Sequence, residues 1–104
     1  MDLRIDELIV EEDRQHHIEK HKVVIGEVLE VVLGDYVFIK AKYGRWQIIG
    51  ETQKGRVLSI IIGERFKKYT YGFITARPAN RKERSFYKEF IAQLGGEGDE
   101  KKRK

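Results

Sequence analysis

The stretch YVFIKAKYGRWQIIGETQKGRVLSIIIGERFKKYTYGFITAR, residues 36–77, decides the fold. Its apolar residues recur with a period close to two, and it is rich in valine, isoleucine, tyrosine and phenylalanine, as is typical of β-strands. Gly44, Gly55 and Gly63 lie in short breaks of that pattern, where tight turns are expected. Short turns favour antiparallel pairing. The stretch therefore predicts a four-stranded antiparallel meander with strands over residues 36–42, 45–51, 57–63 and 69–77.

Two helices are predicted before this stretch. Residues 11–22 are polar, with acidic residues in the first turn, where the helix dipole favours negative charge. Residues 24–33 have the spacing of a helix with one buried stripe, and Gly34 is a natural stop. The predicted stripe consists of Val24, Ile25, Val28, Leu29 and Val32. Residues 3–10 are apolar enough for a short strand or an irregular lead-in.

A third helix is predicted after the sheet. Pro78 has no N–H to donate and so ends the last strand. Asn80 and Glu83 have the spacing of a capping box, and Gly95 with Gly96 is expected to end the helix. The fold class is therefore α+β, with two N-terminal helices, the four-stranded meander and a C-terminal helix. We expect one domain over residues 1–94 and a charged, disordered tail over 95–104.

Composition narrows the function. The chain of 104 residues has no cysteine, which argues against a disulfide framework, a thiolate metal site and a cysteine nucleophile. Its apolar runs fall short of the roughly 18 residues of a membrane span, and the acidic N-terminus does not resemble a signal peptide. We expect a soluble cytoplasmic protein with no membrane contact.

Charge is divided unevenly along the chain. Residues 1–35 hold 4 Lys/Arg and 10 Asp/Glu, whereas residues 36–93 hold 13 and 4. A basic segment of this kind indicates a polyanionic partner. The alternative is a surface on which the charges mix in three dimensions.

The histidines and glycines give little support to a metal or nucleotide site. His17 and His21 are one helical turn apart, but the zinc-protease pattern needs glutamate after the first histidine, where this chain has Ile18. Residues 51–56 lack the spacing of a phosphate-binding loop. We therefore predict no metal and no cofactor. His21 is either a structural histidine or a phosphate contact and general acid or base, since its ordinary pKa lies near neutrality.

The strongest pattern interleaves basic and aromatic residues. Arginine offers a planar fork to phosphate, and aromatic faces stack unpaired bases, so the pattern indicates single-stranded RNA. The alternative is that the aromatics are core and the arginines pair with acids. Glu83 falls on the apolar side of its helix, where we predict a structural salt bridge to Arg77 or Arg56. The set is Arg45, Trp46, Arg56, Arg65, Lys67, Lys68, Tyr69, Tyr71, Arg77, Arg81, Arg84, Tyr87 and Lys88.

These residues carry a resemblance to a known family. Residues 75–84 (TARPANRKER), followed by Tyr87, resemble the C-terminal signature of BrnT-type toxins of the RelE-like superfamily. Residues 20–23 (KHKV) are similar to their Lys-His-Gly-Val segment, with Lys22 where glycine is usual. In the central strands of the family an arginine precedes an Ile-Gly-x-Thr-x-x-Gly-Arg stretch. This chain is similar there, with Arg45 followed by Ile49-Gly50, Thr52 and Gly55-Arg56. The resemblance covers about residues 18–87, and the lead-in lacks the family's usual aromatic-x-Asp start.

The resemblance implies a RelE-like fold and a metal-independent endoribonuclease, the toxin of a type II toxin–antitoxin system. It further implies a ribbon-helix-helix antitoxin, assembly as a dimer or a heterotetramer with that antitoxin, and contact with operator DNA only through it. The alternatives are a non-catalytic RNA-binding or protein-interaction module and a housekeeping protein with a structural role.

Attack of an RNA 2′-OH on the adjacent phosphate needs a base, positive charge at the phosphorane and an acid. We predict Arg56 and Arg77 for the charge, Glu51 or His21 for the base and Tyr87 for the acid. The predicted RNA contacts are Arg45, Trp46, Arg81, Arg84 and Lys88. This site requires Arg45, Arg56, Arg77 and Arg81 to gather in one cleft, rather than lie on separate sides or each be locked against a carboxylate.

Overall fold

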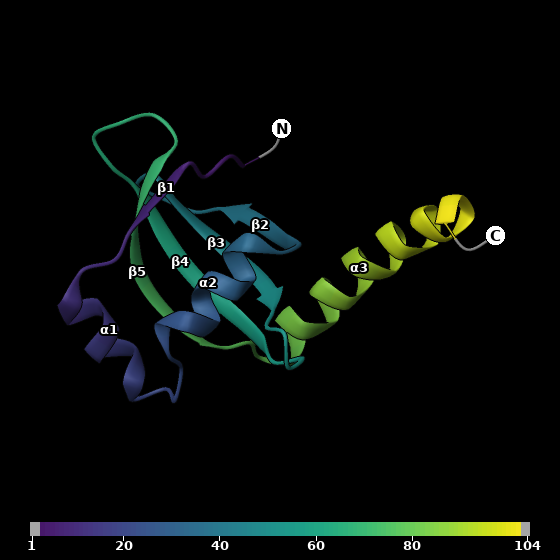
Figure 1. Cartoon of the computed structure of the whole chain (residues 1–104), viewed down its shortest axis with the longest axis horizontal. Coiled ribbons are helices and arrows are strands. Elements are labelled where there is room, and N and C mark those ends of the chain that lie inside the picture. The colour runs from purple at the N-terminus through teal and green to yellow at the C-terminus, as the bar shows by residue number, and fades with distance from the viewer. Residues whose placement is uncertain (1–2, 103–104) are drawn as a thin grey trace.

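Three helices and a five-stranded sheet make up the described part of the chain (Figure 1). The structure is a computed structural model that describes residues 3–102, with side chains over residues 3–93. Within those residues no helix is both long and apolar enough to cross a membrane. The elements are β1 (Glu7–Ile9), α1 (Glu12–Glu19), α2 (Ile25–Leu33), β2 (Tyr36–Lys40), β3 (Arg45–Glu51), β4 (Val57–Glu64), β5 (Thr70–Pro78) and α3 (Arg81–Lys102).

The sheet has the strand order β1-β5-β4-β3-β2. Strands β2 to β5 form the predicted antiparallel meander. The prediction of a wholly antiparallel four-stranded sheet was wrong, because β1 adds a fifth strand parallel to β5, with Leu8 opposite Tyr71. Three residues are too few to show a strand period, so the sequence left this segment open between a strand and a lead-in. Pairing with β1 gives the backbone of β5 a partner on its outer edge.

The two faces of the sheet differ in cover. Helices α1 and α2 lie on one face, which we call the helix-covered face (Figure 1). There Leu58, Ile60 and Ile62 of β4 are fully buried against the helices. Each such side chain contributes about 1.5–3 kcal/mol through removal from water. Alternate residues point to the other side, the open face, which carries Gln47, Ser59, Ile61, Thr75 and Arg77.

The buried stripe of α2 differs from the predicted one. Val28 and Val31 are fully buried against the sheet. Val24 is 59% exposed and Leu29 is 42% exposed, so their assignment to the stripe was wrong. Val24 precedes the first helical residue in an extended conformation, which takes its side chain off the helical spiral. The buried face of α2 therefore consists of Val28 and Val31, with Ile25 and Val32 partly buried beside them.

Helix α3 begins at the predicted cap and extends further than predicted. Asn80 Oδ1 accepts from the Glu83 N–H at 2.8 Å, and the Asn80 N–H donates to Glu83 Oε1 at 2.9 Å. The helix continues through Gly95 and Gly96 to Lys102, and its far half points away from the sheet (Figure 1). Glycine costs a helix about 1 kcal/mol relative to alanine but does not forbid it. The predicted disordered tail is thus helical to Lys102, and residues 103–104 lie outside the described residues.

The first half of α3 packs on the open face over β2 and β3. Its buried residue Tyr87 meets Val37 and Ile49, and Phe90 and Ile91 pack beside them. Phe86, one position before Tyr87, is 43% exposed. This second, smaller cluster fixes where α3 starts relative to β5, and so places Glu83 against the sheet.

The turn between α1 and α2 contains a strained lysine, which gives a first prediction. Lys22 has a φ of 59°, in the left-handed region that favours glycine. We expect Lys22→Gly to raise the free energy of unfolding by about 0.5–1 kcal/mol, after the larger backbone entropy of glycine is counted. Urea unfolding measures the change.

Lys20→Gly is the matched control, because Lys20 has a right-handed φ of −65°. Glycine there should lower the stability by up to about 1 kcal/mol. Equal destabilisation by both substitutions would contradict the strain assigned to Lys22.

Candidate functional site

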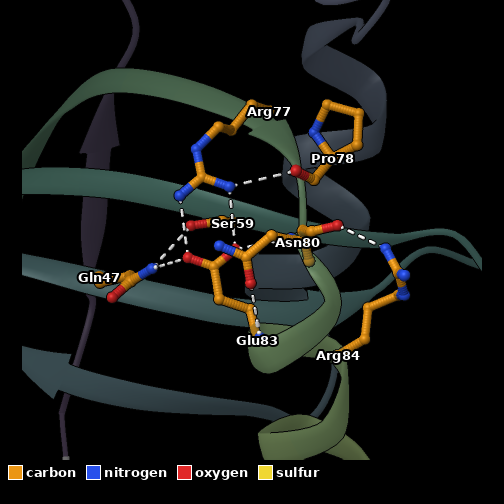
Figure 2. A network of polar contacts seen from close by, with 8 residues as sticks. Gln47, Ser59, Arg77, Pro78, Asn80, Glu83 and Arg84 are labelled. Atoms are coloured by element: carbon orange, nitrogen blue, oxygen red, sulfur yellow. Dashed lines mark hydrogen bonds and ion pairs between the residues drawn. The ribbon is translucent and has the colours of Figure 1, made fainter.

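An arginine fork on the open face is the centre of the candidate site. Arg77 is the last residue but one of β5, and it meets Glu83 of α3 in a bidentate pair (Figure 2). Its Nη1 donates to Glu83 Oε1 at 2.9 Å, and its Nη2 donates to Glu83 Oε2 at 2.8 Å. The predicted salt bridge of Glu83 is thereby confirmed, with Arg77 as its partner. Parallel N–H bonds of this kind fix the orientation of a guanidinium as well as its position.

Two strand residues that the sequence analysis did not single out complete the cluster. Gln47 Nε2 donates to Glu83 Oε2 at 2.8 Å and to Ser59 Oγ at 2.9 Å (Figure 2). Ser59 pairs across the sheet with Arg77. Both interrupt apolar runs of their strands, and a polar residue between buried ones is the signal that could have identified them. The carboxylate of Glu83 is thus held from two sides.

The electrostatics keep both partners charged. Hydrogen bonding from Arg77 is the main cause that lowers the pKa of Glu83, against the opposing effect of burial. The same hydrogen bond is the main cause that raises the pKa of Arg77. The Glu83 side chain is 14% exposed and that of Arg77 is 42% exposed. Arg77 therefore reaches solvent with its charge intact, while the oxygens of Glu83 are engaged with Arg77, Gln47 and the Asn80 N–H.

Other predicted RNA contacts lie at different distances from Arg77. Arg45 is on the same face as Arg77. It pairs with Gly63, and Arg77 pairs with Ser59, four residues earlier on β4, so the two arginines are roughly 14 Å apart along the strands. Arg84 donates to the carbonyl of Ala79 at 2.7 Å and lies on the other side of the start of α3 from Arg77 (Figure 2). Arg81 and Lys88 are exposed on α3.

Arg56 lies across the sheet from Arg77. Its Nη1 donates to Glu27 of α2 at 3.0 Å and to the carbonyl of Lys22 at 2.7 Å. The guanidinium also approaches the carbonyl of His21 at 3.5 Å, so Arg56 and His21 belong to the same side. The expectation that four arginines share one cleft was wrong for Arg56. The carboxylate of Glu27 and the carbonyls of His21 and Lys22, in the turn after α1, hold it on the helix-covered side.

The predicted acid and base form a weak pair under α3. The Tyr87 hydroxyl donates to Glu51 Oε1 at 3.5 Å. Burial, and then the charges of Glu51 and Asp35, raise the pKa of Tyr87, so its hydroxyl keeps its proton. Tyr87 is only 5% exposed.

Trp46 belongs to the helix-covered face. Its ring packs edge-on against Phe38 with centroids 5.8 Å apart, and Lys40 Nζ lies 5.8 Å from its centre. Among the described residues its buried Nε1 has no hydrogen-bond partner. The tryptophan predicted to contact RNA is thus separated from Arg77 by the sheet.

No metal site is formed by the part of the chain that the structure describes. Within those residues, no group of three or more His, Asp or Glu side chains is arranged to hold a metal ion. The rings of His17 and His21 lie 6.3 Å apart, edge to face.

The fold and the arginine fork define an α+β protein with a mixed five-stranded sheet, two helices on one face and a C-terminal helix that closes part of the other. The crystal structure of the Brucella abortus ribonuclease toxin BrnT has the same fold, with a TM-score of 0.59 and 18% sequence identity over 72% of this chain and 97% of that chain. The predicted BrnT-type fold is confirmed. No model of a known protein family matches the sequence, and neither does any curated protein.

Proposed function

We propose that this chain is the toxin of a type II toxin–antitoxin system and a metal-independent endoribonuclease. The observation that supports this most is the Arg77 fork, held by Glu83 and Gln47 on the open face with its outer side in solvent. A second support is the shared fold with a protein described as a ribonuclease toxin.

The reaction that suits such a site is transfer of an RNA phosphodiester to its own 2′-oxygen. The 2′-hydroxyl gives its proton to a base as its oxygen forms a bond to phosphorus, the bond from phosphorus to the 5′-oxygen breaks, and the 5′-oxygen leaves with a proton from an acid. The products are a 2′,3′-cyclic phosphate and a 5′-hydroxyl. Negative charge builds up on the phosphorane oxygens, and a cation fixed in advance stabilises that charge more in the transition state than in the substrate. Arg77 supplies this cation, with Arg45 and Arg81 on flanking phosphates.

Proton transfer requires a base for the 2′-hydroxyl and an acid for the departing 5′-oxygen. Glu51 stays the predicted base and Tyr87 the predicted acid, whereas Arg56 and His21, across the sheet from Arg77, are given no role at the fork. Because Arg56 and His21 lie on the helix-covered side and Tyr87 is buried, the fork acts mainly through positioning and electrostatics. That implies a slow nuclease, which is acceptable for a cytoplasmic toxin needed in few copies.

The proposal includes a partner. A ribbon-helix-helix antitoxin would neutralise the chain by covering the open face, and operator DNA would be bound only through that antitoxin in a heterotetramer. The exposed side of Arg77 is the part of the site that such a partner would have to shield.

The test is incubation of the purified chain with single-stranded RNA in excess EDTA. We expect slow cleavage into fragments with 2′,3′-cyclic phosphate or 3′-phosphate ends and 5′-hydroxyl ends, and no cleavage of the same sequence as DNA, which lacks the 2′-OH. Fragments with 5′-phosphate ends, or cleavage that needs a divalent metal, would contradict the proposed chemistry.

A second candidate is a non-catalytic RNA-binding or protein-interaction module. The observation that favours it is that both carboxylate oxygens of Glu83 already accept hydrogen bonds. The cluster beside Arg77 therefore has no free carboxylate to take a proton. Binding of RNA without cleavage under the same conditions would support this candidate.

A further inference from the structure

Two hairpin ends meet at the end of the sheet away from α3. The turn between β2 and β3 and the loop between β4 and β5 lie side by side, because Arg45 pairs with Gly63 and the Glu64 N–H donates to the Gly44 carbonyl at 2.8 Å. Figure 1 shows the β4–β5 loop projecting beyond the sheet. We call residues 40–45 and 64–69 together the hairpin-tip surface. The basic and aromatic pattern of the sequence is densest here, yet the proposed function uses only Arg45.

The hairpin-tip surface is strongly cationic. Its two segments hold six lysines and arginines and one glutamate. Within the described residues no carboxylate lies in ion-pairing distance of Lys42, Lys67 or Lys68, and all three are exposed. Arg65 approaches Glu11 only to 3.9 Å. The charge is therefore available to an anionic partner.

Two aromatic rings stand in solvent on this surface. Tyr43 is 89% exposed and Phe66 is 83% exposed, so neither contributes to the core. Tyr43 and Gly44 have φ values of 61° and 69°, and the Arg45 N–H donates to the Lys42 carbonyl at 3.2 Å, as in a type I′ turn. Such a turn prefers asparagine, aspartate or glycine at the position of Tyr43. Folding thus gains nothing from this tyrosine, and its backbone is strained.

A hollow connects the hairpin-tip surface to the open face. It has a volume of about 270 Å³, and Tyr43, Arg45 and Arg65 are among the residues that line it. The Arg65 side chain lies directly over Gly72, where a Cβ would be 2.5 Å from Arg65 Nη1. From Arg45 the open face runs roughly 14 Å along β4 to the level of Arg77. An extended nucleic-acid strand covers that distance in a few nucleotides.

We propose that the hairpin-tip surface binds single-stranded RNA beside the segment held at Arg77. Unpaired bases stack on Tyr43 and Phe66, and the phosphates between them meet Lys42, Lys67 and Lys68. The inference rests on the proposed function for its ligand. A protein partner fits the surface less well, because lysine is depleted at the centres of protein interfaces and exposed aromatics flanked by lysines are typical of single-strand binding.

The test is binding of a fluorescein-labelled, 12-nucleotide RNA with 2′-O-methyl groups, which cannot be cleaved by 2′-OH attack. Fluorescence anisotropy measures Kd for the wild type, Tyr43→Asn, Phe66→Ser and the double variant. Loss of one stacked base should weaken binding about 5- to 150-fold. Tyr43→Asn should leave the melting temperature unchanged or raise it, because asparagine suits the turn. Leu33→Ser, which removes an 86% exposed apolar side chain on α2, is the control and should stay within about twofold of the wild type.

The outcomes separate this inference from the proposed function. If the wild type cleaves RNA in EDTA and the double variant binds the 12-mer as the wild type does, the hairpin-tip inference is overturned and the nuclease stands. If the wild type binds through Tyr43 and Phe66 but does not cleave, the RNA site stands and the nuclease does not. If the double variant binds RNA normally but no longer binds the proposed ribbon-helix-helix antitoxin, the surface is a protein-docking site. Failure of the wild type both to bind and to cleave overturns the two together.

Discussion

Replacement of Arg77 with alanine is expected to slow RNA cleavage in EDTA about 100- to 1,000-fold, the usual cost of removing one preorganised group that stabilises transition-state charge. Arg77→Lys should recover only part of the rate. Lysine keeps the positive charge beside Glu83 but cannot offer a planar fork that holds the carboxylate and faces the phosphate at once. The measurement is the single-turnover rate at saturating protein, which separates chemistry from binding.

Lys54→Ala is the control for this series. Lys54 is an exposed cation in the turn between β3 and β4, outside the Arg77 cluster, so its loss lowers the net charge without touching the fork. Its rate should match the wild type. If Arg77→Ala folds normally and cleaves at the full rate, Arg77 has no part in the proposed chemistry.

Replacement of Glu83 with alanine is expected to lower the free energy of unfolding by about 2–3 kcal/mol. The substitution leaves Arg77 and half-buried Gln47 without their shared acceptor and deprives the Asn80 N–H of its side-chain cap. For a domain of this size the melting temperature should fall by roughly 10 °C or more. Glu89→Ala is the matched control, since Glu89 is exposed on the same helix.

The same pair gives the stability a dependence on pH. Because the pKa of Glu83 is lower in the folded state than in the unfolded chain, its contribution is complete above the unfolded value. It is lost as the pH falls from about 4.5 through the folded pKa. Glu83→Gln should remove this part of the acid dependence. An acid unfolding profile of Glu83→Gln that runs parallel to that of the wild type would contradict the role given to the pair.

Much of the fold could be predicted because its signals are local. Strands β2 to β5 each show an apolar period of two between turn residues. The capping box of Asn80 and Glu83 correctly predicts that α3 begins directly after Asn80. Strand β1 could not be predicted with certainty, because its evidence is a pairing with residues some sixty positions later. Helix α3 ran past Gly95 and Gly96 because a glycine penalty of about 1 kcal/mol weakens a helix without ending it.

The candidate site was harder to predict because it depends on which face each residue takes. Glu83 had to find an arginine, but Arg56 and Arg77 were equal choices until the register was known. Arg56 is two residues before Leu58 and four before Ile60, so its side chain points to the same, helix-covered face as theirs. On β5 the alternation of side chains between the two faces is interrupted opposite Ile61 and Ile62, where the register shifts. A simple count of residues therefore could not show which β5 side chains share a face with which on β4.

The pairing of β1 with β5 also sets an order of events during synthesis. Glu7 lies opposite Thr70, so the N-terminal strand has no place in the sheet until the ribosome has released the segment that also carries Arg77. Contacts this distant in sequence form late, since a long loop must close first. The arginine fork also needs Glu83, eleven residues beyond Gly72, so it forms only after the partner of β1 has been synthesised.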